Sequence, residues 1–410
     1  VLGGFILAGA MQRWALHRRI ALTVVHALGT RPHRVVLGFM LATAFLSMWV
    51  SNTATAVMMM PIGLSVIALV APPRAATPDD KDGPATPDGP APLPGQLNFG
   101  TALMLGIAYA ASIGGLGTLI GTPPNALLAG YMEATYGVRI GFARWMMLGV
   151  PLVVVAVPLA WVLLTRIAFP IRITEIPGGR SAIRGQLDAL GRVSAAERRV
   201  AAVFALTAAA WVARPLLDDV IPGLDDAGIA IAAALLLFIL PAGSRNGGGG
   251  SARLMDWTTA ERLPWGVLLL FGGGLSLAAA VTSSGLADWI GRALAGLDAW
   301  PTVLLVLAVT TVVIFLTELT SNTATAAALL PVLGPLAVAM GDDPLLLTVP
   351  AALAASCAFM LPVATPPNAL VYGSGYVTIP QMVRAGFWLN LLFIVLITAA
   401  AYAGLLAVIA

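Results

Sequence analysis

The sequence predicts an all-α polytopic membrane protein built from two inverted repeats, and three observations lead to that prediction. Of the 410 residues, 59% are hydrophobic and only 10% are charged, whereas about a quarter of the residues in a soluble domain are charged. The apolar stretches are continuous, which is typical of membrane-spanning helices and not of the alternating strands of a barrel. Two polar sequences also occur twice in the same order, which indicates a duplicated unit.

The duplicated unit is marked by a Ser-Asn-Thr sequence followed by a Pro-Pro-Asn sequence. Ser-Asn-Thr-Ala-Thr occupies residues 51–55 and again 321–325, and Thr-Pro-Pro-Asn-Ala-Leu occupies residues 122–127 and again 365–370. The first pair is 27 residues further apart than the second, and 27 residues is the length of a segment at 71–97 that is rich in proline and aspartate. Once this predicted disordered cytoplasmic loop is set aside, the two copies match in spacing.

The first part of the chain, residues 1–34, is expected to complete a scaffold span and then to lie along the membrane surface. Residues 12–30 place arginines and histidines among Trp14 and aliphatic side chains, a pattern typical of an amphipathic surface helix. The chain opens with Val1 inside an apolar stretch, so we expect earlier spans to be missing. We expect a solvated face, not a metal site, from the three histidines, which are His17, His26 and His33.

Residues 35–70 are predicted to form a re-entrant helical hairpin with the Ser-Asn-Thr sequence at its tip. No charge occurs between Val35 and Pro73, and the tip divides this stretch into arms of about 16 residues. A helix of that length reaches about 24 Å, which is short against a hydrocarbon core of about 30 Å. Two full spans, with the tip at the far interface, are the alternative.

Residues 98–169 are predicted to hold a broken helix and then a span at 145–169. The first half of the broken helix, 99–120, is expected to end at the two prolines, because tandem prolines remove two backbone donors and stop a helix. The second half is expected at 126–136. Unwound backbone inside a membrane is tolerated only where it lines a cavity.

The rest of the chain is predicted to hold a connector, further scaffold spans and the second repeat. A basic cytoplasmic connector is expected at 170–199. Residues 200–301 are expected to supply scaffold spans at 200–214, 228–241 and 265–281, together with a flexible linker at 247–250 and a second surface helix at 283–300. Residues 302–341 form the second predicted hairpin. Residues 342–410 hold the second broken helix, with halves at 345–363 and 369–376, and the last span at 382–410.

The basic residues indicate that the two repeats are inverted. When the first basic cluster is placed in the cytoplasm, 18 of the 22 Lys and Arg residues fall on that side of the predicted spans, which is a strong positive-inside bias. Five predicted spans separate the two hairpins, so the first opens to the cytoplasm and the second to the outside. Inverted repeats with broken helices are the architecture of secondary transporters.

The repeated polar sequences suit the binding of sodium ions and an anion. Hydroxyl and amide oxygens are uncharged ligands for a hard cation, and their O–H and N–H groups can donate to a carboxylate. The helix N-termini at the breaks add positive dipole ends, and unwound carbonyls at Gly121 and Ala364 can face a cation. Two cation sites beside one anion site are therefore predicted. The alternative is that these side chains only join helices together.

These motifs resemble those of the divalent anion:sodium symporter family. The likeness lies in residues 47–55 and 317–325, in both Thr-Pro-Pro-Asn breaks and in the openings at 2–5 and 16–22, and it covers essentially the whole chain. It implies a homodimeric elevator transporter, embedded in lipid, whose hairpins and broken helices carry the substrate past a scaffold. It also implies Na⁺-coupled import of C4-type dicarboxylates such as succinate, malate and fumarate. Compared with the family's usual plan, we expect about three N-terminal spans to be absent.

The resemblance further implies the residues of three sites. The first Na⁺ site falls on Ser47, Ser51, Asn52 and the Gly121 carbonyl. The second falls on Thr317, Thr320, Asn322 and the Ala364 carbonyl. The substrate carboxylates are expected to meet residues of both tips and both breaks, namely Ser51, Asn52, Thr53, Thr122, Pro123, Ser321, Asn322, Thr323, Thr365 and Pro366.

Several alternatives remain open from the sequence. A dicarboxylate exchanger, or a sulfate or tricarboxylate symporter, would share the same scaffold. Glu318 is the one acid deep in an apolar stretch, so it is either a structural hydrogen-bonding group or a proton site. An enzyme is not expected, because Glu318 and Cys357 lack a base partner, and a channel fits paired inverted breaks poorly. No nucleic-acid partner is expected, and the arginine-rich composition, with one lysine, indicates a bacterial inner-membrane protein.

Overall fold

The structure is a computed structural model of the chain. It describes residues 2–29, 31–70, 94–176, 178–217, 223–245, 251–286, 289 and 300–402. Within these ranges the chain is nearly all helical, which confirms the predicted fold class. The described part has five helices that are long and apolar enough to cross a membrane, namely Asn52–Val70, Leu97–Gly115, Phe142–Ala168, Asn322–Ala339 and Ile379–Tyr402. Five shorter apolar helices accompany them.

The chain begins with two helices and the first hairpin. Helix α1 (Leu2–Arg13) and helix α2 (Leu16–Leu28) are separated at Ala15, whose φ of 54° is left-handed. The predicted start of the surface helix at residue 12 is therefore wrong, because residues 12 and 13 belong to α1. The hairpin consists of α3 (Pro32–Ser47) and α4 (Asn52–Val70), with the tip between them.

The first broken helix unwinds earlier than predicted. Its first half, α5 (Pro94–Gly115), ends five residues before the predicted end and takes in 94–97, which the sequence assigned to the loop. The remainder of that loop, 71–93, lies outside the described residues. The second half, α6 (Pro123–Tyr136), begins at the first proline, because proline is well suited to the first turn of a helix. The following span is α7 (Phe142–Val162), extended by the π-helix η1 (Leu163–Ala168).

The middle of the chain contains elements that the sequence did not predict. The connector holds a helix, α8 (Gly179–Ala189), before the helices α9 (Ala195–Leu217) and α10 (Asp226–Ile239). A short antiparallel hairpin of β1 (Pro241–Arg245) and β2 (Ser251–Arg253) follows. The predicted linker, 247–250, and most of the predicted surface helix, 283–300, lie outside the described residues. Between them come α11 (Trp257–Ala260) and α12 (Trp265–Ser283).

The second repeat follows the same plan as the first. Its hairpin consists of α14 (Thr302–Thr317) and α15 (Asn322–Ala339). The broken helix is α16 (Leu345–Ala355) and α17 (Pro366–Gly373), so its first half also ends earlier than predicted, at residue 355 and not at 363. The last described helix is α18 (Ile379–Tyr402).

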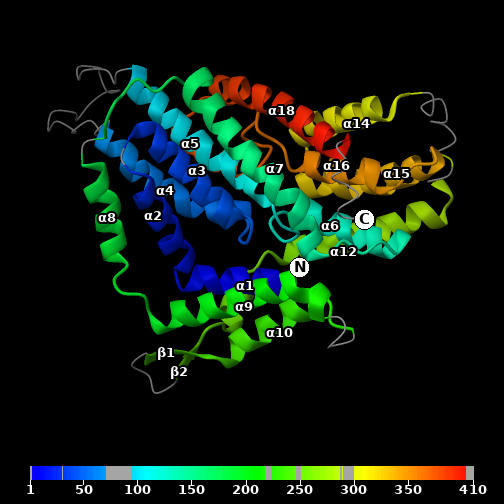
Figure 1. Ribbon diagram of the computed structural model, residues 1–410, viewed down its shortest axis with the longest axis horizontal. Coiled ribbons are helices and arrows are strands. Elements are labelled where there is room, and N and C mark those ends of the chain that lie inside the picture. Colours follow the sequence, from blue (N-terminus) through cyan, green and yellow to red (C-terminus); the bar gives the residue numbers. More distant parts are fainter. Residues whose placement is uncertain are drawn as a thin grey trace, which may run out of the picture.

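Figure 1 shows that the two hairpins and broken helices form one body, with α1, α9, α10 and the strands in a layer beneath it. Within the body, α3 and α4 pack on α5, while α14 and α15 pack on α16. In the layer, α1 packs on α10 and α9. Helix α12 lies against α6 and α15, and α8 runs along one side, in contact with α2 and α4.

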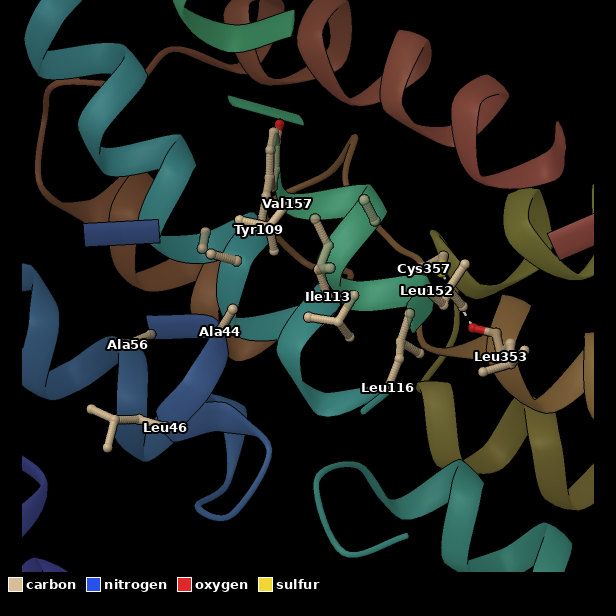
Figure 2. Packing of buried hydrophobic residues seen from close by; sticks show 14 of the residues in the cluster. Ala44, Leu46, Ala56, Tyr109, Ile113, Leu116, Leu152, Val157, Leu353 and Cys357 are labelled. Carbon is tan, nitrogen blue, oxygen red and sulfur yellow. Dashed lines mark hydrogen bonds between the residues drawn. The ribbon is translucent and has the colours of Figure 1, made fainter. Parts of the chain in front are cut away.

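The core of the body depends on very close helix contacts. Figure 2 shows Ala44, Ile113 and Leu152 packing where α3, α5 and α7 meet. A β-carbon added at Gly114 of α5 would lie 2.2 Å from the Ala44 carbonyl oxygen of α3. Only glycine allows the two backbones to approach this closely, a common device in membrane helix packing.

We expect the Gly114→Ala variant to unfold at a clearly lower temperature than the wild type. The added methyl would meet backbone, so the helices must separate, which typically costs about 1–3 kcal/mol. The control is Gly272→Ala on α12, where an added β-carbon has no atom within 4 Å, and helix propensity favours alanine by about 1 kcal/mol. Thermal unfolding in detergent measures both. Equal unfolding temperatures for the two variants would contradict the close packing of α3 on α5.

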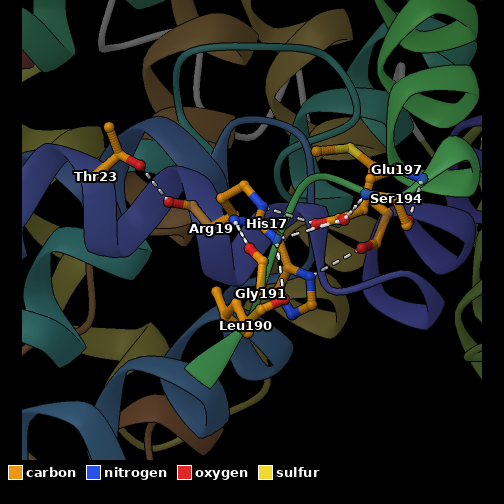
Figure 3. Close-up of polar contacts among 8 residues, drawn as sticks. His17, Arg19, Thr23, Leu190, Gly191, Ser194 and Glu197 are labelled. Carbon is orange, nitrogen blue, oxygen red and sulfur yellow. Dashed lines mark hydrogen bonds and ion pairs between the residues drawn. The ribbon is translucent and has the colours of Figure 1, made fainter. Parts of the chain in front are cut away.

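A buried ion pair joins α2 to the start of α9. The Arg19 side chain donates to the Glu197 carboxylate at 2.9 Å and to the carbonyls of Gly191 and Leu190 (Figure 3). Glu197 also forms a capping box with Ser194, since Ser194 N–H donates to the carboxylate at 2.7 Å and Glu197 N–H donates to the Ser194 hydroxyl at 3.1 Å. These bonds hold the surface helix α2 to the connector.

Candidate functional site

The structure brings both tips and both breaks to one cavity of about 780 Å³. All ten residues predicted to meet the substrate line it, although they come from segments more than 300 positions apart in the chain. Its polar lining comes mainly from the tips at 51–53 and 320–323 and from the breaks at 121–123 and 364–366. Ser47 and Thr317, predicted as sodium ligands, do not line the cavity but lie fully buried behind the tips.

Four helices begin at this cavity. Helices α4 and α15 start at the tip residues Asn52 and Asn322, and α6 and α17 start at Pro123 and Pro366. The first N–H groups of a helix have no partner within it, and the N-terminus carries a partial positive charge. Because proline has no N–H, the free backbone donors come from α4 and α15, while α6 and α17 add their dipoles. The cavity is therefore suited to an anion.

Behind the first tip, the Ser47 hydroxyl, the Asn52 amide and two backbone carbonyls lie close together. The Ser47 hydroxyl lies 2.6 Å from the Asn52 side-chain oxygen and 2.6 Å from the Ala111 carbonyl oxygen. When the Asn52 amide is turned, its nitrogen donates to the Gly121 and Ala111 carbonyls at 3.2 and 3.0 Å. Asn52 therefore links the first tip to the break and to α5.

The second tip repeats much of this geometry. The Thr317 hydroxyl donates to the Asn322 side-chain oxygen at 2.9 Å and lies 2.9 Å from the Ala355 carbonyl oxygen. Ala355 thus takes the place that Ala111 has in the first repeat. Thr320, a predicted sodium ligand, lies 2.6 Å from the Thr325 hydroxyl and also donates to a backbone carbonyl. The fourth predicted ligand, Ala364, lines the cavity beside Asn322.

The asparagines of the Pro-Pro-Asn sequences hold the unwound segments in place. The Asn125 amide nitrogen donates to the Gly115 and Thr118 carbonyls at 3.1 and 2.9 Å. The Asn368 amide nitrogen donates to the Ala358 and Leu361 carbonyls at 3.1 and 3.0 Å. No role was predicted for these two asparagines, although their occurrence in both copies of the motif was a signal that they have one. Each replaces part of the hydrogen bonding that a broken helix loses.

Glu318 performs a similar task in the second repeat alone. Its carboxylate accepts from the backbone N–H groups of Phe359, Met360 and Leu361 at 2.7, 2.9 and 3.1 Å. The Asn390 amide of α18 donates to it at 2.8 Å. Met48 occupies the matching position in the first repeat, where the Thr118 hydroxyl donates to the Met48 carbonyl. Among the described residues, the groups around the Glu318 carboxylate are therefore donors that anchor the break.

An aromatic cluster connects the first tip to α9. Trp49 packs edge-on against Phe204 of α9, with ring centroids 4.9 Å apart, and stacks on Phe142 at 6.0 Å. Phe142 in turn stacks on Trp211 of α9 at 4.2 Å. The tip thus contacts α9 of the layer beneath the body through the edge-on pair of Trp49 and Phe204.

The far wall of the cavity was not predicted. It consists of Phe5, Ala8, Gly9 and Gln12 of α1, together with Arg262, Leu263, Pro264 and Val267 around the start of α12. Arg262 is the one charged residue in the described lining. In the sequence, Arg262 is only one of the basic residues predicted on the cytoplasmic side. No sequence pattern links the start of α12 to tips that lie far away in the chain.

The chain is similar to known proteins over nearly its whole length. The sequence profile of the sodium:sulfate symporter transmembrane region matches residues 1–409. The chain is 46% identical over 404 residues to the sodium-dependent dicarboxylate transporter SdcS of Staphylococcus saprophyticus, covering 98% of this chain and 75% of that protein. It is 45% identical, with the same coverage, to the protein of the same name from Staphylococcus aureus strain USA300.

The fold is also similar to a solved structure. The crystal structure of the Alcanivorax borkumensis YdaH transporter, whose title describes an unusual topology, aligns with a TM-score of 0.60. The alignment covers 98% of this chain and 84% of that one at 13% sequence identity. At this identity the similarity concerns the fold alone.

Proposed function

The chain belongs to the sodium:sulfate symporter family, and we propose that it uses Na⁺ to import C4-type dicarboxylates such as succinate, malate and fumarate. It is a multi-pass membrane transporter and not an enzyme. Relatives that are 45–46% identical over nearly the whole chain carry the name sodium-dependent dicarboxylate transporter. That similarity supports both the coupling ion and the substrate class.

In this proposal the cavity holds one dianion between two sodium ions. The first ion would lie among Ser47, Ser51, Asn52 and the Gly121 carbonyl, where the Ser47 hydroxyl and the Asn52 side chain are 2.6 Å apart. The second would lie at Thr317, Thr320, Asn322 and the Ala364 carbonyl. The substrate would meet the ten tip and break residues that line the cavity. The ions would offset the charge of the dianion, since the tips and breaks carry no basic side chain.

The proposed transport movement is an elevator. The hairpins and broken helices form one body, and the cavity lies between that body and α1 with the start of α12. Movement of the body past this wall would expose the cavity to each side in turn. The positive-inside bias places Gln12 and Arg262 toward the cytoplasm, so the cavity described here would be the inward-open one. Residence in the bacterial inner membrane and assembly as a homodimer belong to the same proposal.

The single observation that carries the proposal is the convergence of both tips and both breaks on one cavity. Its test is uptake of radiolabelled succinate into proteoliposomes with an inward Na⁺ gradient. We expect uptake that concentrates succinate, that needs Na⁺, and that stops when the gradient is dissipated. Uptake that needs internal dicarboxylate and ignores the gradient would instead establish an exchanger.

The substrate class is tested by competition within the same assay. Because the family profile bears the name of sulfate symporters, sulfate is the most direct competitor. We expect unlabelled succinate, malate and fumarate to inhibit uptake strongly, and sulfate and citrate to inhibit it weakly. Stronger inhibition by sulfate than by succinate would contradict the proposed substrate.

A further inference from the structure

We propose that Arg262 is a specificity-determining residue whose positive charge favours dianions over monovalent anions in this cavity. The inference rests on the proposed function and adds to it a group outside the repeated motifs. Arg262 lines the same cavity as the tips, and the other described lining residues are uncharged. A dianion in the cavity therefore has one full charge on the protein near it.

The charge of Arg262 is not neutralised by a neighbouring acid. The ion pairs found among the described residues do not include Arg262. Of the two acids in the preceding six residues, Asp256 is paired with Arg13 of α1 at 2.6 Å. Burial would raise the pKa of the Asp256 carboxyl, but hydrogen bonds from Thr259 and Arg13 hold it below its ordinary value. Asp256 thus stays ionised and bound to Arg13, and Glu261 does not line the cavity.

The backbone at Arg262 is fixed to the cavity wall. Asp256 caps α11 through a 2.9 Å bond from the Thr259 N–H, and the Arg13 guanidinium donates to the Thr259 hydroxyl at 3.2 Å. Arg262 N–H donates to the Thr259 carbonyl. The backbone turn that carries Arg262 is therefore anchored to α1. In an elevator Arg262 would face the substrate only while the body occupies the position seen here.

The expected change in substrate affinity is that produced by a single charge acting across an open, hydrated cavity. A unit charge about 10 Å from a dianion in water changes affinity by about fourfold, and salt screens much of this effect. A monovalent anion experiences half the energy. Removing the charge should thus reduce both the affinity for succinate and its preference over a monovalent analogue, while leaving the Na⁺ dependence unchanged.

The test is the affinity of purified transporter in detergent for succinate and for monomethyl succinate, at a fixed Na⁺ concentration. Ionic strength is varied with choline chloride. We expect Arg262→Gln to bind succinate about fourfold more weakly than the wild type at low ionic strength, with a smaller difference at high ionic strength. Arg262→Lys should bind nearly as the wild type. The matched control, Arg198→Gln, removes the same charge at an exposed position outside the cavity and should have no effect.

A second variant separates charge from structure. Cys357, the one cysteine of the chain, is fully buried, so Arg262→Cys adds a single accessible thiol. Labelling it with a positively charged aminoethyl methanethiosulfonate should restore succinate affinity, and labelling it with the negatively charged sulfonatoethyl reagent should weaken it further. Equal affinities with the two labels would overturn the inference. If the wild type itself fails to bind succinate with Na⁺, the proposed function fails and not this inference alone.

Discussion

Replacing Asn52 or Asn322 with alanine is expected to abolish Na⁺-dependent succinate uptake. Each amide lies at the start of a hairpin arm, lines the cavity and contacts a buried hydroxyl behind it, Ser47 or Thr317. Loss of a group that merely orients a metal ligand costs about 10- to 100-fold in metal affinity, and we propose that these amides are themselves ligands. We therefore expect the affinity for Na⁺ to fall by at least this factor in either variant.

Thermal unfolding at increasing Na⁺ concentration separates a ligand from a structural side chain. A ligand that binds only the folded protein raises the unfolding temperature as its concentration rises, so both variants should lose most of this rise. The control is Asn98→Ala, since Asn98 lies outside the cavity and donates to the Pro170 carbonyl. Normal stabilisation by Na⁺ in Asn52→Ala or Asn322→Ala, even with a lower starting temperature, would sink the assignment.

Replacing Glu318 with alanine is expected to cause a severe loss of folded protein. The change leaves three backbone N–H groups and the Asn390 amide without their acceptor in a buried segment. Each unsatisfied buried group costs about 1–3 kcal/mol, which together approaches the whole stability of many proteins. Yield of monodisperse transporter and its thermal unfolding temperature measure the effect.

Two further variants complete the experiment on Glu318. The control, Glu133→Ala, removes an exposed carboxylate paired with Arg139 at 2.9 Å and should cost no more than about 1 kcal/mol. Glu318→Gln keeps one acceptor oxygen, so it should be intermediate in stability, with the same dependence of uptake on pH as the wild type. If the wild type shows pH-dependent uptake and Glu318→Gln removes that dependence, Glu318 is a proton site after all.

The order of the elements and the polar residues of the cavity were predictable from the sequence, because both depend on local sequence patterns. A polar tip inside an uncharged stretch predicts a hairpin, and two adjacent prolines predict a broken helix. Their repetition, with one loop accounting for the difference in spacing, predicted that the two halves would share one plan. The structure has both hairpins and both breaks, and it places the four polar segments on one cavity.

The ends of the broken helices were not predictable, because they depend on distant side chains. Residues 116–121 contain no proline, and Pro362 lies seven residues after the observed end of α16 at Ala355, so the local sequence does not mark either helix end. In the folded chain Asn125 and Asn368 satisfy carbonyls of the two unwound segments, and Glu318 satisfies N–H groups of the second segment alone. The far wall of the cavity escaped prediction for the same reason: Arg262 and α1 meet only in the folded chain.

The convergence of four helix N-termini on the cavity has a consequence for how such transporters can diverge. The positive potential there comes from the backbone of α4, α6, α15 and α17, and a mutation that exchanges one side chain for another leaves that backbone in place. The shape and hydrogen-bonding capacity of the cavity, by contrast, depend on replaceable side chains such as Thr53 and Thr323. A lineage can therefore change which anion it carries by point mutation, while the sign of the charge it carries is inherited with the fold.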